Sequence, residues 1–190
     1  MSRLFFSFRV PSKLCARFAE EATRLDRAGA RVLWAKAENL HITLRFVGEV
    51  HERNLLEVLQ AGKQALQGMK RLPLVAVGLD AFPDREHPRV VVCGVRGDGE
   101  AAQTALLALR AKVDAALDEA GWKPEREVWR PHVTLGRVRG DLQVELLGER
   151  IGPAARREFG HFTCSEVVLF ESFHGREGVS YTPLQTFSAC

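Results

Sequence analysis

The sequence contains one four-residue pattern twice, as His41-Ile42-Thr43-Leu44 and as His132-Val133-Thr134-Leu135. In both copies polar and apolar residues alternate, which is the pattern of a half-buried β-strand. Because successive side chains of a strand point to opposite faces, the histidine and threonine share one face and the two aliphatic side chains share the other. Each copy therefore predicts a strand that buries its aliphatic face and presents an imidazole and a hydroxyl on the opposite face.

These residue types suit acid–base chemistry on an anion. An imidazole titrates near neutral pH, so it can give or take a proton. A hydroxyl beside it can hold an oxyanion. The chain has six histidines, and random placement would give about 0.1 copies of such a pattern on composition alone. Two motifs that face each other would supply an acid, a base and two anion-holding donors without a metal. The alternative is that each histidine only bonds a neighbour on its strand.

Hydrophobic periodicity predicts an order of elements around the motifs. Apolar residues at helical spacing indicate helices after Pro11, at 52–67, from Gly99 to about 120, and at 141–150. Alternating or β-branched runs, with Gly48 as the end of the first motif strand, indicate strands at 3–10, 31–35, 40–47, 72–80, 89–95, 126–130, 132–138, 161–170 and 179–186. The order strand, helix, strand, strand, helix, strand is thus predicted twice, with residues 171–178 as a connecting segment.

The predicted fold class is α+β, a bilobal duplicated fold with two mainly antiparallel sheets and outer helices around a central cleft. The chain is expected to be a single domain, 1–190, with pseudo-repeat halves at roughly 1–85 and 86–190. Exchange of a strand between the lobes is left open. A pseudo-twofold axis would bring the two motifs together in the cleft.

Composition excludes several classes of function. A net charge of +3 rules out a strongly basic nucleic-acid coat protein. The four cysteines form no C-x-x-C pair and no zinc-ligand spacing with the histidines, so structural disulfides are not expected and a reducing cytoplasm fits. A signal peptide and a membrane partner are not expected, because no apolar run is long enough. A metal site built on the two histidines would lack Asp, Glu or Cys partners at ligand spacing.

The motifs and their surroundings resemble the two-histidine phosphoesterases, and within them the bacterial and archaeal 2′-5′ RNA ligase, or RNA 2′,3′-cyclic phosphodiesterase, family. The resemblance runs in order from Leu4 to Phe187. It rests on both motifs and on flanking residues, namely Arg3-Leu4-Phe5-Phe6 with Pro11, residues 39–48, Phe82-Pro83, Arg130-Pro131 with Arg137, residues 168–172, and Tyr181.

The resemblance implies a bilobal fold with both motifs in a central cleft. It also implies metal-independent hydrolysis of an RNA 2′,3′-cyclic phosphate end to a 2′-phosphate, a capacity for 2′-5′ ligation, and no cofactor. His41 would be the proton donor and His132 the proton acceptor, and Arg137 would help to bind phosphate. The expected partners are RNA ends with a 2′,3′-cyclic phosphate, tRNA fragments among them, and the expected oligomeric state is a monomer.

Opening a cyclic phosphodiester by in-line attack needs a base and an acid on opposite sides of phosphorus, which one histidine in each lobe would provide. Thr43 and Thr134 could donate hydrogen bonds to the non-bridging oxygens. Arg137 has neither the alternation of His132 nor a certain register, so its role depends on the resemblance alone. Residues that could stack on a base, or else belong to the core, are Phe6, Phe8, Trp34, Phe46 and Tyr181.

Two other functions stay open from the sequence. One is a phosphodiesterase in the same superfamily for small cyclic nucleotides or cyclic ADP-ribose phosphate. The other is an RNA-end-binding module without turnover, although pure binding would favour Arg or Lys over matched imidazoles. The arginines near the second motif are either solvated charges or part of an RNA path; they are Arg126, Arg130 and Arg139.

Overall fold

The computed structural model describes residues 1–123, 125, 127–175 and 178–190. Within these residues the chain forms four α-helices, which are α1 (Ser12–Asp26), α2 (Leu55–Leu66), α3 (Glu100–Glu119) and α4 (Val144–Ile151). The strands are β1 (Ser2–Arg9), β2 (Val32–Trp34), β3 (His41–Val50), β4 (Leu72–Phe82), β5 (Val90–Gly97), β6 (His132–Val138), β7 (Glu158–Cys164), β8 (Glu166–Gly175) and β9 (Gly178–Ser188).

The helices form where apolar residues recur at helical spacing. In α1, which begins after Pro11, the buried apolar side chains are Leu14, Cys15, Phe18 and Leu25. Pro11 suits this position because its fixed φ and missing amide cost a helix start nothing. Gly29, with φ +80°, lies three residues beyond the helix end. The helix thereby buries one stripe against the sheet and leaves its other side to solvent.

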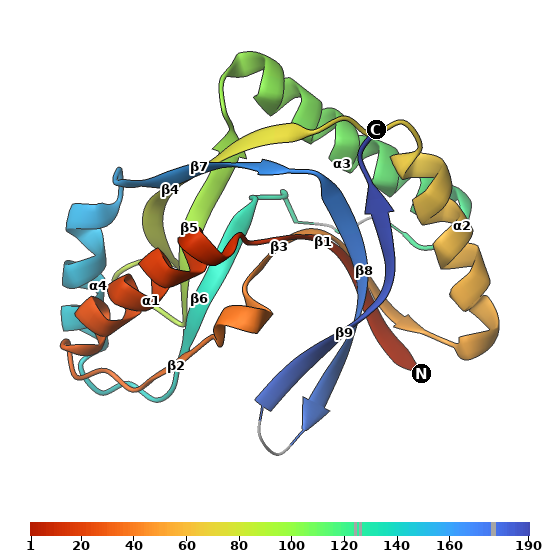
Figure 1. The fold of residues 1–190 in the computed structure, drawn as a ribbon. Coiled ribbons are helices and arrows are strands. Elements are labelled where there is room, and N and C mark those ends of the chain that lie inside the picture. Colours follow the sequence, from red (N-terminus) through yellow and green to blue (C-terminus); the bar gives the residue numbers. More distant parts are fainter. Residues whose placement is uncertain (124, 126, 176–177) are drawn as a thin grey trace.

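All strands belong to one curled antiparallel sheet (Figure 1). The strand order is β7-β4-β5-β6-β3-β1-β8-β9, and β2 pairs with β6 beside this path. The two expected sheets are joined between β3 and β6 by a single residue pair, Ile42 opposite Val133. The predicted α+β class with antiparallel pairing is therefore confirmed, and the junction of the two sheets lies inside the two motifs.

Chain halves do not correspond to sheet halves. The C-terminal strands β8 and β9 extend the side that contains β1 and β3, whereas β4 from the N-terminal half lies between β5 and β7. Figure 1 shows α1 and α4 together at one side of the sheet and α2 with α3 at the other, and it shows the β8–β9 hairpin projecting beyond the remaining strands. The internal duplication of residues 1–85 and 86–190 stays a prediction.

The predicted order of elements is right in the first half and wrong in the second. Of the strand expected at 126–130, residues 127–130 form no strand, and Arg126 lies outside the described residues. Trp129 in this segment instead uses its side chain, whose Nε1 donates to the Thr43 carbonyl on β3. The absence of a strand here also removes the second copy of the predicted six-element order.

The C-terminal strands are longer and more numerous than predicted. The expected strand at 161–170 is two strands, β7 and β8, which are separated at Ser165. Most of the expected connection at 171–178 is strand, because β8 and β9 stay paired from Glu166–Ser188 to Gly175–Gly178. Likewise, β3 does not end at Gly48 but continues to Val50, with Gly48 at φ +89° paired to Leu4 on β1.

Candidate active site

The junction of β3 and β6 brings the two motifs side by side. Ile42 and Val133, the paired residues, are both 0% exposed and belong to the core. Their neighbours along each strand point to the opposite face and are half-buried. Extending the antiparallel register by one residue sets His41 opposite Thr134 and Thr43 opposite His132. The four polar motif residues thus form one group on one face, with the two histidines on its diagonal.

Both imidazoles are held in the same way by the backbone. Nδ1 of His41 lies 2.7 Å from the carbonyl oxygen of Asn39, and Nδ1 of His132 lies 2.7 Å from the carbonyl oxygen of Arg130. A carbonyl oxygen can only accept, so Nδ1 must carry the hydrogen in each ring. Nε2 is then the nitrogen that gains or loses a proton. Each histidine is therefore fixed in the tautomer that a general acid or base needs.

Aromatic rings pack against both histidines. The His41 ring lies 4.9 Å from the ring of Phe5 and 4.9 Å from Tyr181, which meets it edge-on at 80°. The His132 ring meets Phe82 edge-on at 81°, with 5.1 Å between centroids. These contacts limit rotation of the imidazoles, and they remove part of each ring from water. Preorganised rings lose less freedom when a substrate binds.

Burial and charge lower the pKa of both histidines. Burial lowers the pKa of His41 from its usual 6.5, and the positive charges of His132 and Arg137 lower it further, against the hydrogen bond to Asn39. Burial also lowers the pKa of His132, with a smaller contribution of the same sign from Arg137 and an opposing one from the Arg130 carbonyl. The free site thus favours neutral imidazoles at pH 7, and a bound anion would favour their protonation.

A β-bulge explains how Arg137 reaches the motif face. Val91 pairs with Gly136 but Val92 pairs with Thr134, so Leu135 is an extra residue on β6. The bulge shifts the alternation by one, which puts Arg137 on the same face as His132 and Thr134. The charge of Arg137 acts on His41, His132 and Tyr181. The expectation that Arg137 does not alternate in step with His132 is therefore wrong, and Arg137 lies beside the motif residues.

The first motif contains the matching irregularity. Phe6 pairs with Arg45 and Ser7 with Thr43, so Leu44 is the extra residue on β3. Phe46 consequently lies on the motif face, 52% exposed, at the place that corresponds to Arg137 in the second motif.

Of the candidate stacking residues, Phe6 and Phe8 are in the core at 0% exposure, and Trp34 packs against the core with its Nε1 bonded to Asp26. Phe46 and Tyr181 border the motifs.

A small cleft opens beside His41. Its volume is about 120 Å³, and its walls include Arg9, Asn39, His41, Phe170 and Tyr181. Asn39 also donates from Nδ2 to the Val179 carbonyl at 2.8 Å, which ties β9 to the turn before β3. That bond fixes the strand that carries Tyr181. The cleft thus combines a cation, two aromatic rings and the candidate proton donor.

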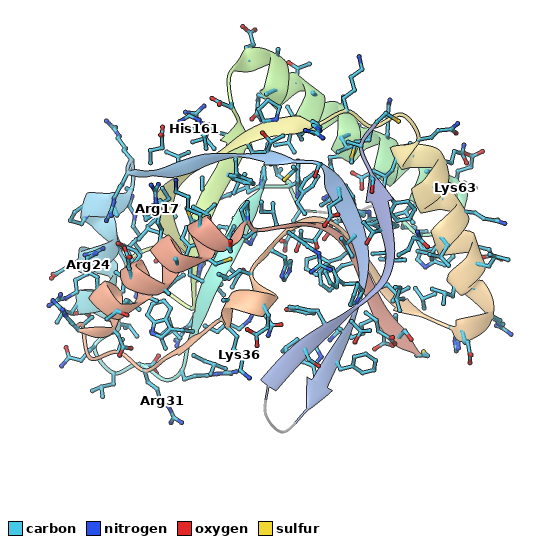
Figure 2. All side chains as sticks on the ribbon, in the orientation of Figure 1. Arg17, Arg24, Arg31, Lys36, Lys63 and His161 are labelled. Carbon is cyan, nitrogen blue, oxygen red and sulfur yellow. The ribbon has the colours of Figure 1, made fainter. Side chains whose placement is uncertain are left out.

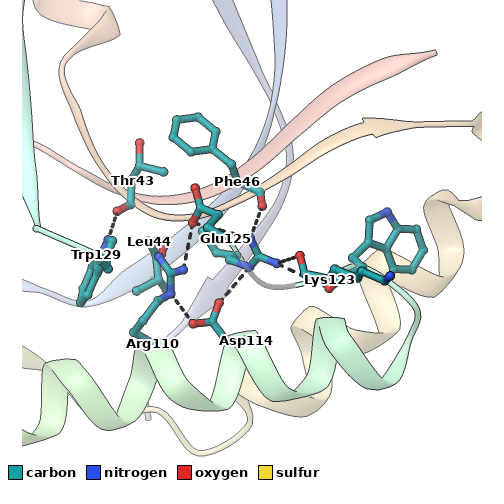
Figure 3. Close-up of polar contacts among 10 residues, drawn as sticks. Thr43, Leu44, Phe46, Arg110, Asp114, Lys123, Glu125 and Trp129 are labelled. Atoms are coloured by element: carbon teal, nitrogen blue, oxygen red, sulfur yellow. Dashed lines mark hydrogen bonds and ion pairs between the residues drawn. The ribbon is translucent and has the colours of Figure 1, made fainter. Parts of the chain in front are cut away.

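Sequence reasoning missed a charge cluster that supports β3 and is built around two buried arginines (Figure 3). We call it the β3 charge cluster; it consists of Arg45, Arg110, Asp114 and Glu125. Arg45 has 2% of its side chain exposed, and its Nε lies 2.8 Å from Asp114 Oδ1. Arg110 pairs with Asp114 at 2.6 Å and with Glu125 at 2.9 Å. Each buried guanidinium is therefore paired with carboxylates.

The same cluster binds the backbone of the first motif strand. Arg110 Nη1 donates to the Leu44 carbonyl at 2.6 Å, and Arg45 Nη1 donates to the Phe46 carbonyl at 2.8 Å. Trp129 Nε1 donates to the Thr43 carbonyl at 3.1 Å, with the Arg110 guanidinium over its ring. The β3–β6 ladder has only one residue pair, so these side chains donate the hydrogen bonds that β3 carbonyls would receive from a longer ladder. They connect α3 and the segment before β6 to the motif.

Two further findings concern metals and membranes. Across the described parts of the chain, no three His, Cys, Asp or Glu side chains gather as metal ligands would. The helices in those parts are also too short or too polar for any of them to cross a membrane.

Comparison with known proteins gives consistent results. Residues 10–176 match the family model of the 2′-5′ RNA ligase superfamily. An RNA 2′,3′-cyclic phosphodiesterase of Methanothermobacter thermautotrophicus is 32% identical over 163 residues, which are 86% of this chain and 85% of that protein. The RNA 2′,3′-cyclic phosphodiesterase of Aeropyrum pernix is 32% identical over 177 residues, covering 93% and 97% of the two chains.

Solved structures have the same fold. The protein TT0787 of Thermus thermophilus superposes with a TM-score of 0.75 and 26% identity over 98% of this chain and 97% of that one. Escherichia coli LigT complexed with 3′-AMP gives a TM-score of 0.76 at 21% identity, over 99% and 98% of the two chains. The match to the family model covers most of the chain, and this chain spans most of the length of both phosphodiesterase relatives. The chain therefore belongs to the 2′-5′ RNA ligase superfamily.

Proposed function

We propose that this protein is an RNA 2′,3′-cyclic phosphodiesterase, which opens the cyclic phosphate at an RNA end to leave a 2′-phosphate without a metal or other cofactor. The observation that carries the proposal is the matched pair of imidazoles, His41 and His132. Each has Nδ1 bonded to a carbonyl, which makes Nε2 the nitrogen that exchanges a proton. The names of the relatives and membership of the superfamily support the same activity.

The reaction exchanges one P–O bond for another. A water oxygen attacks phosphorus and loses its proton to Nε2 of His132, which is the proposed base. The bond from phosphorus to the 3′-oxygen breaks, and His41 gives its proton to that oxygen. Attack and departure occur on opposite sides of phosphorus, and the diagonal arrangement of the histidines on β3 and β6 suits this requirement. Each proton transfer is worth about 10²–10⁴-fold in rate.

The anionic oxygens need donors of their own. We assign Thr43 and Thr134 to the non-bridging oxygens, because each is opposite a histidine on the neighbouring strand and half-buried. Arg137 adds a fixed positive charge on the same face. Removal of one such preorganised donor typically costs about 3 kcal/mol of transition-state stabilisation.

The same residues can perform ligation. A 5′-hydroxyl that replaces water would give its proton to His132, and its oxygen would bond to phosphorus as the 3′-oxygen leaves. The product is a 2′-5′ phosphodiester. We further propose that the RNA ends are those of cleaved transcripts such as tRNA fragments, and that the protein acts as a cytoplasmic monomer. Light scattering of the purified protein measures its molar mass in solution, which for a monomer equals the chain mass of 21.2 kDa.

An end-group assay tests the proposed activity. An oligoribonucleotide with a 2′,3′-cyclic phosphate is incubated with the protein in EDTA, and the terminus is identified by ³¹P NMR. The expected product is the 2′-phosphate. A 3′-phosphate or a strict need for added metal would overturn the mechanism. Faster hydrolysis of a 3′,5′-cyclic nucleotide or of a cyclic ADP-ribose phosphate would assign a small-molecule substrate instead. Tight binding of the RNA end with no product would indicate a binding module.

A sulfur-substituted substrate tests which histidine is the acid. When sulfur replaces the 3′-oxygen in the cyclic phosphate, the leaving group is a thiolate that departs without a proton. Loss of the proton donor then matters little, whereas loss of the base still matters. We expect His41→Ala to regain most of its activity on this substrate and His132→Ala to stay inactive. The opposite pattern would exchange the two roles.

A further inference from the structure

Three arginines share one face of the β2–β6 pair, beyond the motif residues. Leu33 is opposite Arg137, and the Arg139 amide donates to the Arg31 carbonyl at 2.8 Å, which continues the ladder and sets Arg31 opposite Arg139. The intervening Val138 is buried in the core on the other face. Arg31, Arg137 and Arg139 therefore lie on the face that carries His132 and Thr134.

These positive charges have no carboxylate partner within the described residues. Among the ion pairs found there, none includes Arg31, Arg137 or Arg139. Asp141, which follows β6 closely in the sequence, pairs with Arg89 at 2.7 Å instead. Like charges directly opposite each other on a sheet face destabilise the pairing. An anion between Arg31 and Arg139 would remove this repulsion.

A cleft lies at the same place. It has a volume of about 280 Å³ and is lined by Arg31, Val32, Leu33 and Arg139. Leu33 is 55% exposed, so the cleft offers an apolar surface bordered by guanidinium groups. Figure 2 shows Arg31 at the open edge of the sheet beside β2, pointing into solvent. Arginine binds phosphate oxygens with two parallel hydrogen bonds, and an apolar surface suits a ribose or a base.

We propose that Arg31 and Arg139 form a second phosphate site, which binds the RNA chain next to its cyclic-phosphate end. The inference rests on the proposed function and specifies its substrate class, namely oligoribonucleotides in preference to mononucleotides. Arg137 lies at the motifs, and the Arg31–Arg139 pair is two residues farther along the strand, about 7 Å. A chain whose terminal phosphate meets Thr134 and Arg137 can thus place another phosphate on the pair.

Kinetics with two substrates test the second site. The variant Arg31→Ala/Arg139→Ala is compared with the wild type on a mononucleoside 2′,3′-cyclic phosphate and on an eight-nucleotide RNA with the same end. We expect KM for the oligomer to rise at least about tenfold with kcat unchanged, and both constants for the mononucleotide to stay unchanged. Loss of this one phosphate contact should also reduce the salt dependence of log(kcat/KM) for the oligomer by about 0.7.

The control variant Lys70→Ala/Arg71→Ala also removes two exposed positive charges, just before β4, and should leave oligomer kinetics unchanged. Equal losses on both substrates, an unchanged KM for the oligomer, or an equal effect of the control would overturn the second site. Fluorescence anisotropy with an RNA that already ends in a 2′-phosphate needs no turnover. If the wild type hydrolyses neither substrate, the proposed function fails, while the Kd of the Arg31→Ala/Arg139→Ala variant still decides the second site.

Discussion

Replacement of Arg45 by methionine should destabilise the protein strongly, because it breaks the β3 charge cluster. The Arg45 side chain is 2% exposed and lies 2.8 Å from Asp114 and 3.5 Å from Glu125. Methionine fills a similar volume without charge, so the packing loss is small. The two carboxylates then lose a cation, and the Phe46 and Lys123 carbonyls lose a donor.

The expected loss follows from the burial of the group. Removal of one partner from a buried ion pair costs about 3–5 kcal/mol. Asp114 is 27% exposed and keeps Arg110 at 2.6 Å, which favours the lower end, about 3 kcal/mol. For a chain of this size, each kcal/mol corresponds to about 2–4 °C in Tm, so the melting temperature should fall by about 6–12 °C. Urea unfolding followed by circular dichroism gives the free energy of unfolding directly.

Arg9→Met provides the matched control. Arg9 also pairs with a glutamate, Glu166, at 3.4 Å, but the two side chains are 49% and 38% exposed. Exposed pairs contribute about 0–1 kcal/mol, so this variant should unfold almost as the wild type does. If Arg45→Met and Arg9→Met lose similar amounts of stability, burial does not set the contribution of the cluster, and the reasoning is wrong.

Three further predictions concern the site and its surroundings. Burial and the charge of Arg137 lower the pKa of His41 and His132. The pH profile of kcat/KM is bell-shaped because it needs one protonated and one neutral imidazole, so it should peak below pH 6.5 and decline as pH rises. Arg137→Ala raises both pKa values, so the declining limb should move to higher pH; a limb that stays in place would contradict the effect of Arg137 on the histidines. Arg137→Lys keeps the charge but loses two-point binding of phosphate, so steady-state kinetics should show kcat/KM reduced about tenfold with an unshifted pH profile. A shifted profile would show that the charge of residue 137 is not what sets the pKa of the histidines. Ser7 is 0% exposed and its Oγ finds no partner among the described residues, so Ser7→Ala should stabilise the protein by about 1 kcal/mol in urea unfolding; a loss of stability would show that the hydroxyl is bonded.

The core of the candidate site was predictable because it depends on a local rule. Alternation with period two places His41 with Thr43, and His132 with Thr134, on one face of any strand. Arg137 was not predictable from alternation, because the bulge at Leu135 changes the period and arises from pairing between β5 and β6. Bulges depend on the partner strand, and a single strand sequence does not reveal them.

The β3 charge cluster shows another limit of sequence reasoning. In a regular strand, Arg45 would share a face with Thr43, yet the extra residue Leu44 turns it inward, where Asp114 comes from a helix about seventy residues later. Prediction of the fold succeeds and fails for the same reasons. Helix α2 matches its predicted segment closely, because the spacing of apolar residues that predicts it lies within the segment itself. The long β8–β9 pairing was not predicted, because the residues near Gly175 and Gly178 are polar and look like a loop in the sequence.

The most direct test of the central claim compares single-turnover hydrolysis by the wild type, His41→Ala and His132→Ala in EDTA. The substrate is an oligoribonucleotide with a 2′,3′-cyclic phosphate, and folding of each variant is checked by circular dichroism. If the two histidines are the acid and base, each variant should fold normally and lose about 10²–10⁴-fold in the rate of 2′-phosphate formation. A folded variant of either histidine that opens the ring within a few-fold of the wild-type rate would contradict the account.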